Sequence, residues 1–160
     1  MAGEGRFSKR VDKMKRDRAA ERYRSETPPQ EALVPEFSPK DSPSYIAMKL
    51  IDAYSQAVYQ GNMFALQHIF TPEMVEAVAY KLRGINLGGR LVQPILRDRE
   101  LELVSQDNRE WKLLLSYRDE TEYHDRGGNL LAANPGEEVR LLVHILKNPP
   151  RISGIFSTET

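Results

Sequence analysis

The sequence predicts an α+β domain in which helices come first and an antiparallel sheet follows. Apolar residues recur with a helical period of about 3.6 between positions 44 and 83, and with a period of about two beyond Leu91. The turn signals between the later segments are short enough for hairpins, which favours antiparallel pairing over parallel β-α-β units. We therefore expect three N-terminal helices packed on a curved antiparallel sheet.

Start and stop signals delimit the three helices. Ser42-Pro43 is typical of an N-cap followed by proline in the first turn, and Gly61-Asn62 is expected to stop the first helix. A short second helix is expected over residues 64–70. Thr71-Pro72-Glu73 marks the start of the third helix, since it combines a cap, a first-turn proline and a first-turn acid, and Gly84 is expected to end it.

Four strands are expected after position 100, over residues 101–105, 111–118, 139–146 and 151–157. Alternation places Trp111, Leu113, Leu115 and Tyr117 on one face of the second strand, and Leu114 on the other. Residues 125–129 carry a hairpin turn signal. The charged run 119–122 is interpreted as a solvated strand end that blocks edge-to-edge pairing.

Charge divides the 160 residues into a basic arm and an acidic body. The formal net charge is zero, but residues 1–24 hold nine basic and four acidic side chains, a net of +5, and the remainder holds a net of −5. A basic segment without an apolar core either stays solvated or folds on an anionic surface such as RNA or lipid. The candidate residues for such a surface are Arg6, Lys9, Arg10, Lys13, Lys15, Arg16, Arg18, Arg22 and Arg24.

Three segments follow from these patterns: a basic arm over 1–25, a proline-rich linker over 26–43 and a folded domain over 44–160. The linker contains five of the ten prolines, which favour extended backbone. The absence of cysteine excludes disulfides, thiolate nucleophiles and cysteine-based zinc sites. We expect neither a secretory signal nor a transmembrane segment, because no apolar stretch is long enough for either.

Candidate sites within the domain are sparse. The three histidines are 56 and 20 residues apart, so no metal site is expected. Four arginines, which are Arg83, Arg90, Arg97 and Arg99, form a candidate phosphate patch, although the acids that alternate with them offer ion-pair partners instead. A candidate interface on the outer sheet face comprises Leu114, Leu142, His144 and Leu146.

Several stretches resemble the NTF2-like superfamily, and its Tim44-like branch in particular. Residues 54–70 look like the family's first helix, glycine-asparagine break and second helix, and Thr71-Pro72-Glu73-Met74 looks like the opening of its third helix. Residues 101–123 and 139–156 are similar to the ladder of long strands. Residues 150–155 are similar to the last strand, except that Pro150 stands where the family often has tryptophan. The resemblance covers residues 44–157.

The resemblance implies a cone-shaped fold and a non-enzymatic tethering or scaffold module of a larger complex. It implies a protein partner or large assembly, such as a ribosome or a membrane translocation complex, with the arm on ribosomal RNA or anionic lipid. It also implies a place in the mitochondrial matrix or cytoplasm, peripheral to a membrane, with no cofactor and with a homodimer as a further expectation. The alternative is a small-molecule-binding protein or enzyme of the isomerase or dehydratase type, with a carboxylate and a tyrosine inside the cone.

Overall fold

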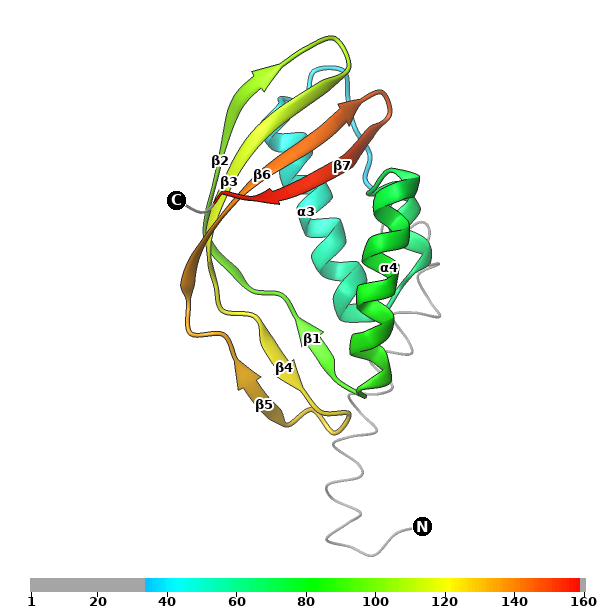
Figure 1. Cartoon of the computed structure of the whole chain (residues 1–160), viewed down its shortest axis with the longest axis vertical. Coiled ribbons are helices and arrows are strands. Elements are labelled where there is room, and N and C mark those ends of the chain that lie inside the picture. Colours follow the sequence, from blue (N-terminus) through cyan, green and yellow to red (C-terminus); the bar gives the residue numbers. More distant parts are fainter. Residues whose placement is uncertain (1–33, 159–160) are drawn as a thin grey trace, which may run out of the picture.

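Two helices and a bent antiparallel sheet face each other (Figure 1) in the structure, a computed structural model that describes residues 34–158 apart from the side chains of Asn86 and Leu87. The basic arm predicted over 1–25, and the linker as far as residue 33, lie outside the described residues. The helical elements are α3 (Pro43–Gln60), the 3-10 turn η1 (Phe64–His68) and α4 (Pro72–Leu87). The predicted α+β class is confirmed.

The helix boundaries follow the predicted signals with two differences. The Oγ atom of Ser42 accepts a hydrogen bond from the Tyr45 amide at 3.2 Å, and Gly61 ends α3 in the left-handed conformation with φ of 65°. The expected second helix is a 3-10 turn. The third begins at Pro72 as expected but continues through Gly84, and the left-handed residue that follows α4 is Gly89, with φ of 70°.

Within the described residues, seven strands form two antiparallel sheets. The strands are β1 (Leu91–Gln93), β2 (Leu96–Gln106), β3 (Glu110–Asp119), β4 (Glu122–His124), β5 (Leu130–Ala133), β6 (Glu137–Lys147) and β7 (Pro150–Ser157). The strand orders are β1-β4-β5 and β2-β3-β6-β7. The four predicted strands correspond to β2, β3, β6 and β7, whereas β1, β4 and β5 were not predicted. The predicted turn at 125–129 joins β4 to β5, and the Asp125 amide donates to the Asn129 carbonyl at 2.9 Å.

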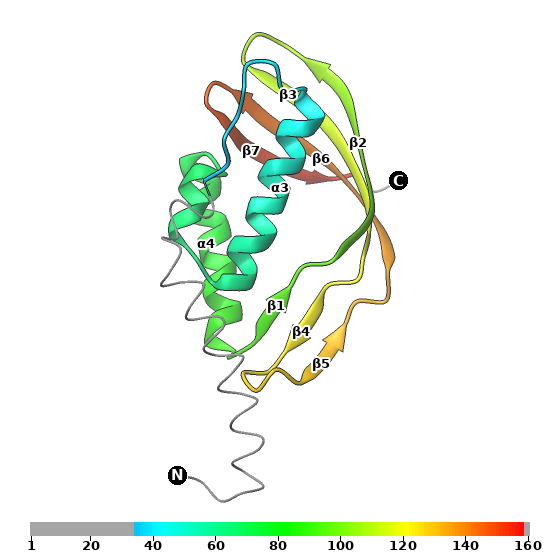
Figure 2. The ribbon, with the colours of Figure 1, turned by 180° about the vertical axis from the view of Figure 1, so that it is seen from behind.

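The two sheets are the halves of one bent surface. The chain passes from β1 to β2, from β3 to β4 and from β5 to β6 through short breaks, and the order of these strands is the same in both halves. Figure 2 shows the two halves meeting along a line, with α3 and α4 on one side of both. We call this line the crease. It lets the sheet turn around the helices without a long loop.

Hydrogen bonds between the three breaks hold the crease. The Asp119 carboxylate accepts from the Thr121 amide at 3.0 Å and from the Asn134 side-chain amide at 3.0 Å. The Thr121 hydroxyl accepts from the Ile95 amide at 3.3 Å, and the Gly136 amide donates to the Asp119 carbonyl at 2.9 Å. The interpretation of residues 119–122 as a solvated strand end is therefore wrong, because Thr121 is buried and Asp119 joins two strands.

The core lies between α3, η1, α4 and the inner face of the larger sheet. Its largest fully buried side chains are Leu50, Leu66, Ile69, Phe70, Leu113, Val143, Ile145 and Ile152. Burying each such side chain stabilises the fold by roughly 1.5–3 kcal/mol. The Tyr54 ring meets the Phe70 ring edge-on, with centroids 5.4 Å apart. The space between helices and sheet is thus filled by side chains from both layers.

Candidate functional site

The outer face of the larger sheet carries an apolar row across three strands. Leu114 of β3 lies opposite Leu142 of β6, which lies opposite Phe156 of β7. Their neighbours Leu113 and Val143 are buried on the inner face, so the row points away from the helices. The Phe156 side chain is 52% exposed. We call Leu114, Leu142, His144 and Phe156 together the outer-face patch.

Gly154 allows the Phe156 ring to lie close to the sheet. A Cβ atom at Gly154 would come within 2.7 Å of Phe156 Cε2, so only glycine leaves room for the ring in this position. The ring packs against His144, with centroids 4.8 Å apart. The Nε2 atom of His144 is buried and has no hydrogen-bond partner among the described residues. The patch is therefore an apolar surface in which the Phe156 ring packs over the His144 side chain.

An apolar groove lies where the larger sheet meets η1 and α4. It has a volume of about 330 Å³, and its lining residues are Gln67, Phe70, Thr71, Pro72, Val75, Leu146, Pro149 and Arg151. Leu146 follows His144 along the same strand face, so the groove continues the outer-face patch. The Arg151 side chain donates to the Gln67 carbonyl at 3.0 Å and to the Pro150 carbonyl at 2.8 Å. Burial lowers the pKa of the Arg151 guanidinium.

The part of the patch formed by β7 and most of β6 is locally basic, although β3 and the start of β6 carry acids and the body as a whole is acidic. Residues 139–158 contain Arg140, Lys147 and Arg151 but neither aspartate nor glutamate. The Nζ atom of Lys147 lies 5.5 Å from the centroid of the Trp111 ring and donates to Gln106 at 3.2 Å. Lys147 therefore lies on the inner face with Trp111, whereas Arg140 and Arg151 share the outer face with the patch. A partner that covers this surface meets these cations on the side of β6 and β7, and Glu102 and Glu110 on the side of β2 and β3.

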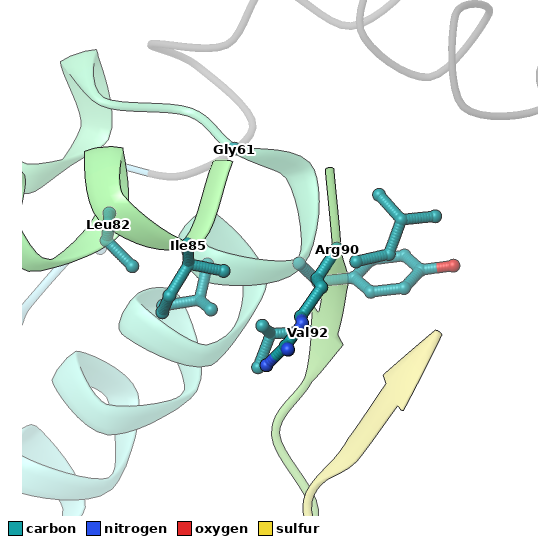
Figure 3. A pocket seen from close by; sticks show the side chains of 8 residues that line it. Gly61, Leu82, Ile85, Arg90 and Val92 are labelled. Carbon is teal, nitrogen blue, oxygen red and sulfur yellow. The ribbon is translucent and has the colours of Figure 1, made fainter. Parts of the chain in front are cut away.

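The structure separates the four arginines of the predicted phosphate patch. Arg97 forms an ion pair with Glu120 at 3.2 Å, and Arg99 forms one with Asp52 on α3. Arg90 instead lines a small pocket of about 40 Å³ between α3, α4 and β1 (Figure 3). Arg83 is exposed on α4. The phosphate patch stays a prediction, with two of its cations already neutralised by carboxylates.

The interior holds two tyrosines with raised pKa values. Burial raises the pKa of Tyr54, and burial together with the nearby Asp119 and Tyr54 raises the pKa of Tyr117 to about 12. Both phenols therefore stay protonated near neutral pH and supply no general base. The Asp119 carboxylate, whose charge helps to raise the pKa of Tyr117, accepts hydrogen bonds at the crease from Thr121 and Asn134.

The described part of the chain offers few groups for acid-base catalysis or metal binding. The groove and the small pocket are each lined without a carboxylate. Between residues 34 and 158 no group of three or more His, Asp or Glu side chains is arranged to hold a metal ion. Among the helices described, none has the length and hydropathy needed to cross a membrane.

The sequence predicted Leu114, Leu142, His144 and Leu146 as outer-face residues. In the structure the first three belong to the outer-face patch, and Leu146 lines the groove. The sequence did not predict Phe156 as an outer-face residue. A register shift between β6 and β7 beside His144 breaks the simple alternation. The sequence therefore did not show which of Ile155 and Phe156 lies on the outer face. The spacing of Gly154 and Phe156, two apart on one strand face, was the available signal. The predicted arm residues lie outside the described residues.

Comparisons with known proteins show similarity of fold. No family model matches the chain, and no curated protein matches it in sequence. Among solved structures, the intermembrane space region of the chloroplast protein ARC6 aligns with a TM-score of 0.55 at 12% identity, covering 78% of this chain and all of that one. TraH of the Gram-positive conjugative plasmid pIP501, named as a transfer protein, aligns with a TM-score of 0.51 at 9% identity, covering 76% of this chain and 98% of that one.

Removing the Tyr117 hydroxyl should change how stability responds to alkaline pH. The Tyr117 pKa is raised from 10.0 in the unfolded chain to about 12 in the fold, so the folded state binds more protons in this interval. Its contribution is fully present below pH 10 and is lost as the pH rises towards 12. For Tyr117→Phe, urea unfolding at several alkaline pH values should therefore show a shallower decline in the free energy of unfolding.

Tyr80→Phe is the matched control, because the Tyr80 side chain is 79% exposed on α4. Its decline should match that of the native chain. An equal decline for Tyr117→Phe and Tyr80→Phe would show that Tyr117 titrates normally.

Proposed function

We propose that the domain is a non-catalytic docking module of a larger complex, which holds a partner protein against the outer-face patch and the groove. One observation carries the proposal: the apolar row of Leu114, Leu142 and Phe156 lies on the sheet face that the helices leave uncovered, and Leu146 on the same face leads to the groove beside η1 and α4. Contiguous exposed apolar surface is characteristic of protein-interaction sites, because covering it removes apolar area from water.

The charges around this surface define the partner. Arg140, Lys147 and Arg151 lie on β6 and β7, and no acid lies between residues 139 and 158. Electrostatic complementarity favours a partner with acidic side chains around its apolar anchors. We therefore propose a protein segment with apolar residues flanked by aspartate and glutamate. Glu102 and Glu110, which lie opposite Leu114 and Leu146, border this surface on the side of β2 and β3, so the acidic residues of the segment belong on the side of β7.

The resemblance to NTF2-like domains of the Tim44-like branch supports this proposal. A bent sheet that closes around helices is the arrangement expected of such a cone, and the branch is mostly non-enzymatic. Of the two structural neighbours, TraH is named for transfer and the ARC6 region for the intermembrane space, and neither name refers to a reaction. The filled interior also speaks against a ligand cavity, since the core contains Tyr54, Trp111 and Phe70 where an isomerase or dehydratase would bind its substrate.

The basic arm completes the proposal. With nine basic and four acidic residues before position 25, it is suited to hold an anionic surface while the domain holds the partner. In the Tim44-like branch such extensions lead to ribosomal RNA or to a membrane. We propose the same tethering arrangement here, on a mitochondrial or cytoplasmic ribosome or a membrane translocation complex.

Peptide selection tests the docking surface directly. A random-peptide display on the full chain should enrich peptides that combine apolar residues with Asp and Glu. Phe156→Ser should weaken their binding by roughly tenfold or more, because it removes an apolar side chain whose burial contributes roughly 1.5–3 kcal/mol. Isothermal titration calorimetry measures the change.

Tyr80→Ser, at a side chain 79% exposed on α4, is the control and should bind as the native chain does. Thermal unfolding of both variants should stay near that of the native chain. Peptides that bind Phe156→Ser unchanged, or that carry no acidic residues, would contradict the proposed surface.

Deletion of residues 1–24 tests the arm. The native chain should bind vesicles with anionic lipid, or isolated ribosomes, more tightly than the deleted chain, and the difference should shrink as salt is raised. Each basic residue near an anionic membrane contributes about 1 kcal/mol, so the net charge of +5 should give a large effect. Vesicles of neutral lipid are the control. Equal binding of both chains to vesicles and to ribosomes would contradict the proposal that the arm binds an anionic surface.

A further inference from the structure

The two sheets have four outer edges among the described residues, and three of them are protected. Two register shifts interrupt the pairing of β2 with β3, and Glu100 and Glu102 are exposed along β2. The chain from Ile69 to Thr71 covers part of β7, because the Ile152 amide donates to the Ile69 carbonyl at 2.7 Å and the Thr71 amide donates to the Ile152 carbonyl at 3.0 Å. Helices α3 and α4 pack against β1. Register shifts, charges and covering segments are the usual means of blocking edge-to-edge pairing.

The fourth edge, β5, carries no charged residue and no described segment covers it, although one register shift interrupts its pairing with β4. All four of its residues are exposed, and the side chains of Leu130 and Leu131 are 58% and 55% exposed. The register shift leaves Leu131 without a partner on β4 and breaks the strict alternation. Because all four residues are exposed, neither face of β5 is covered. Strand β7 ends at Ser157, beside β6, and no described strand continues alongside β5. Figure 1 shows β5 at the rim of the smaller sheet, on the side away from α3 and α4.

We propose that β5 pairs antiparallel with β5 of a second copy of this chain. The sequence of the strand is self-complementary in this arrangement. With the strand centres aligned, Leu130 lies opposite Ala133 of the second copy, and Leu131 lies opposite Ala132. Each large side chain then meets a small one, which lets both strands approach without a clash. A two-fold axis between the strands repeats every contact, as expected for an isologous dimer.

Charges at the two ends of β5 are also self-complementary. Arg126 lies in the turn before the strand, and Glu137 and Glu138 lie just beyond its other end; all three are exposed. None of them forms an ion pair with another described residue. Antiparallel pairing brings the turn end of one copy towards the acidic end of the other, so Arg126 faces acids across the axis twice. Parallel pairing would place like charges together.

The size of this contact sets its strength. A strand of four residues buries far less than the roughly 1,600 Å² of a standard interface, so the dimer is weak and forms in proportion to concentration. The pairing joins the two smaller sheets and leaves the outer-face patch, on β3, β6 and β7, free in each copy. It is therefore independent of the proposed docking function, although a dimer would present two docking surfaces to a bivalent partner.

Analytical ultracentrifugation of the full chain over about a hundredfold range of concentration tests the pairing. The native chain should show a monomer-dimer equilibrium. Leu131→Lys places a charge on the exposed edge and should raise the dissociation constant at least about tenfold. Val104→Lys is the matched control, because Val104 is 57% exposed on the edge strand β2 and should leave the equilibrium unchanged.

Charge reversal identifies the antiparallel arrangement. Arg126→Glu alone, and Glu137→Arg with Glu138→Arg, should each weaken self-association. A mixture of the two variants should form heterodimers more tightly than either variant alone, because opposite charges then meet at both ends. A native chain that stays monomeric at every concentration would overturn the proposal. So would a dimer unaffected by Leu131→Lys, or a mixture that associates no better than its components.

Discussion

The crease is the constraint on which the rest of the structure depends. The chain breaks at the same level between β1 and β2, between β3 and β4, and between β5 and β6. The backbone groups at each break need new hydrogen-bond partners. Asp119 and Thr121 supply these partners to Ile95, Asn134 and Gly136, so the sheet bends without leaving buried donors unsatisfied there. A flat sheet of this length would extend beyond α3 and α4, and much of its inner face would remain in water.

Bending the sheet also determines which surfaces stay free. The inner face closes on the helices, where Tyr54, Phe70 and Trp111 pack. The outer face turns away from the helices and keeps its apolar row exposed, with the groove at one end. The smaller half places β5 at the rim, on the side away from α3 and α4 (Figure 1). The exposure of the outer-face patch and the exposure of β5 are thus both consequences of the bend in the sheet.

Local patterns revealed the elements but not the crease. Caps at Ser42 and Gly61 and the alternation around Trp111 depend on neighbouring residues, so the sequence predicted α3, β3 and the long strands paired with β3. The crease depends on Asp119 meeting Asn134, fifteen residues away, and no periodicity reports such a contact. Strands β1, β4 and β5 are too short to show a period. Four outer-face residues were predicted, whereas Phe156 was hidden by a register shift and the groove by its assembly from two segments far apart in the sequence.

Native-state hydrogen exchange on Asp119→Ala tests the central role of the crease most directly. Removing the carboxylate leaves the Thr121 amide and the Asn134 side chain without their acceptor, at a cost of about 1–3 kcal/mol. The amides of β4 and β5 should lose protection by that amount, while those of β3 and β6 in the larger sheet keep theirs. Asp98→Asn removes an exposed charge paired only with Arg118 among the described residues and keeps a residue type that tolerates the φ of 53° at this position, so it should leave both halves unchanged. Equal loss in both halves, or none in the smaller one, would contradict the account.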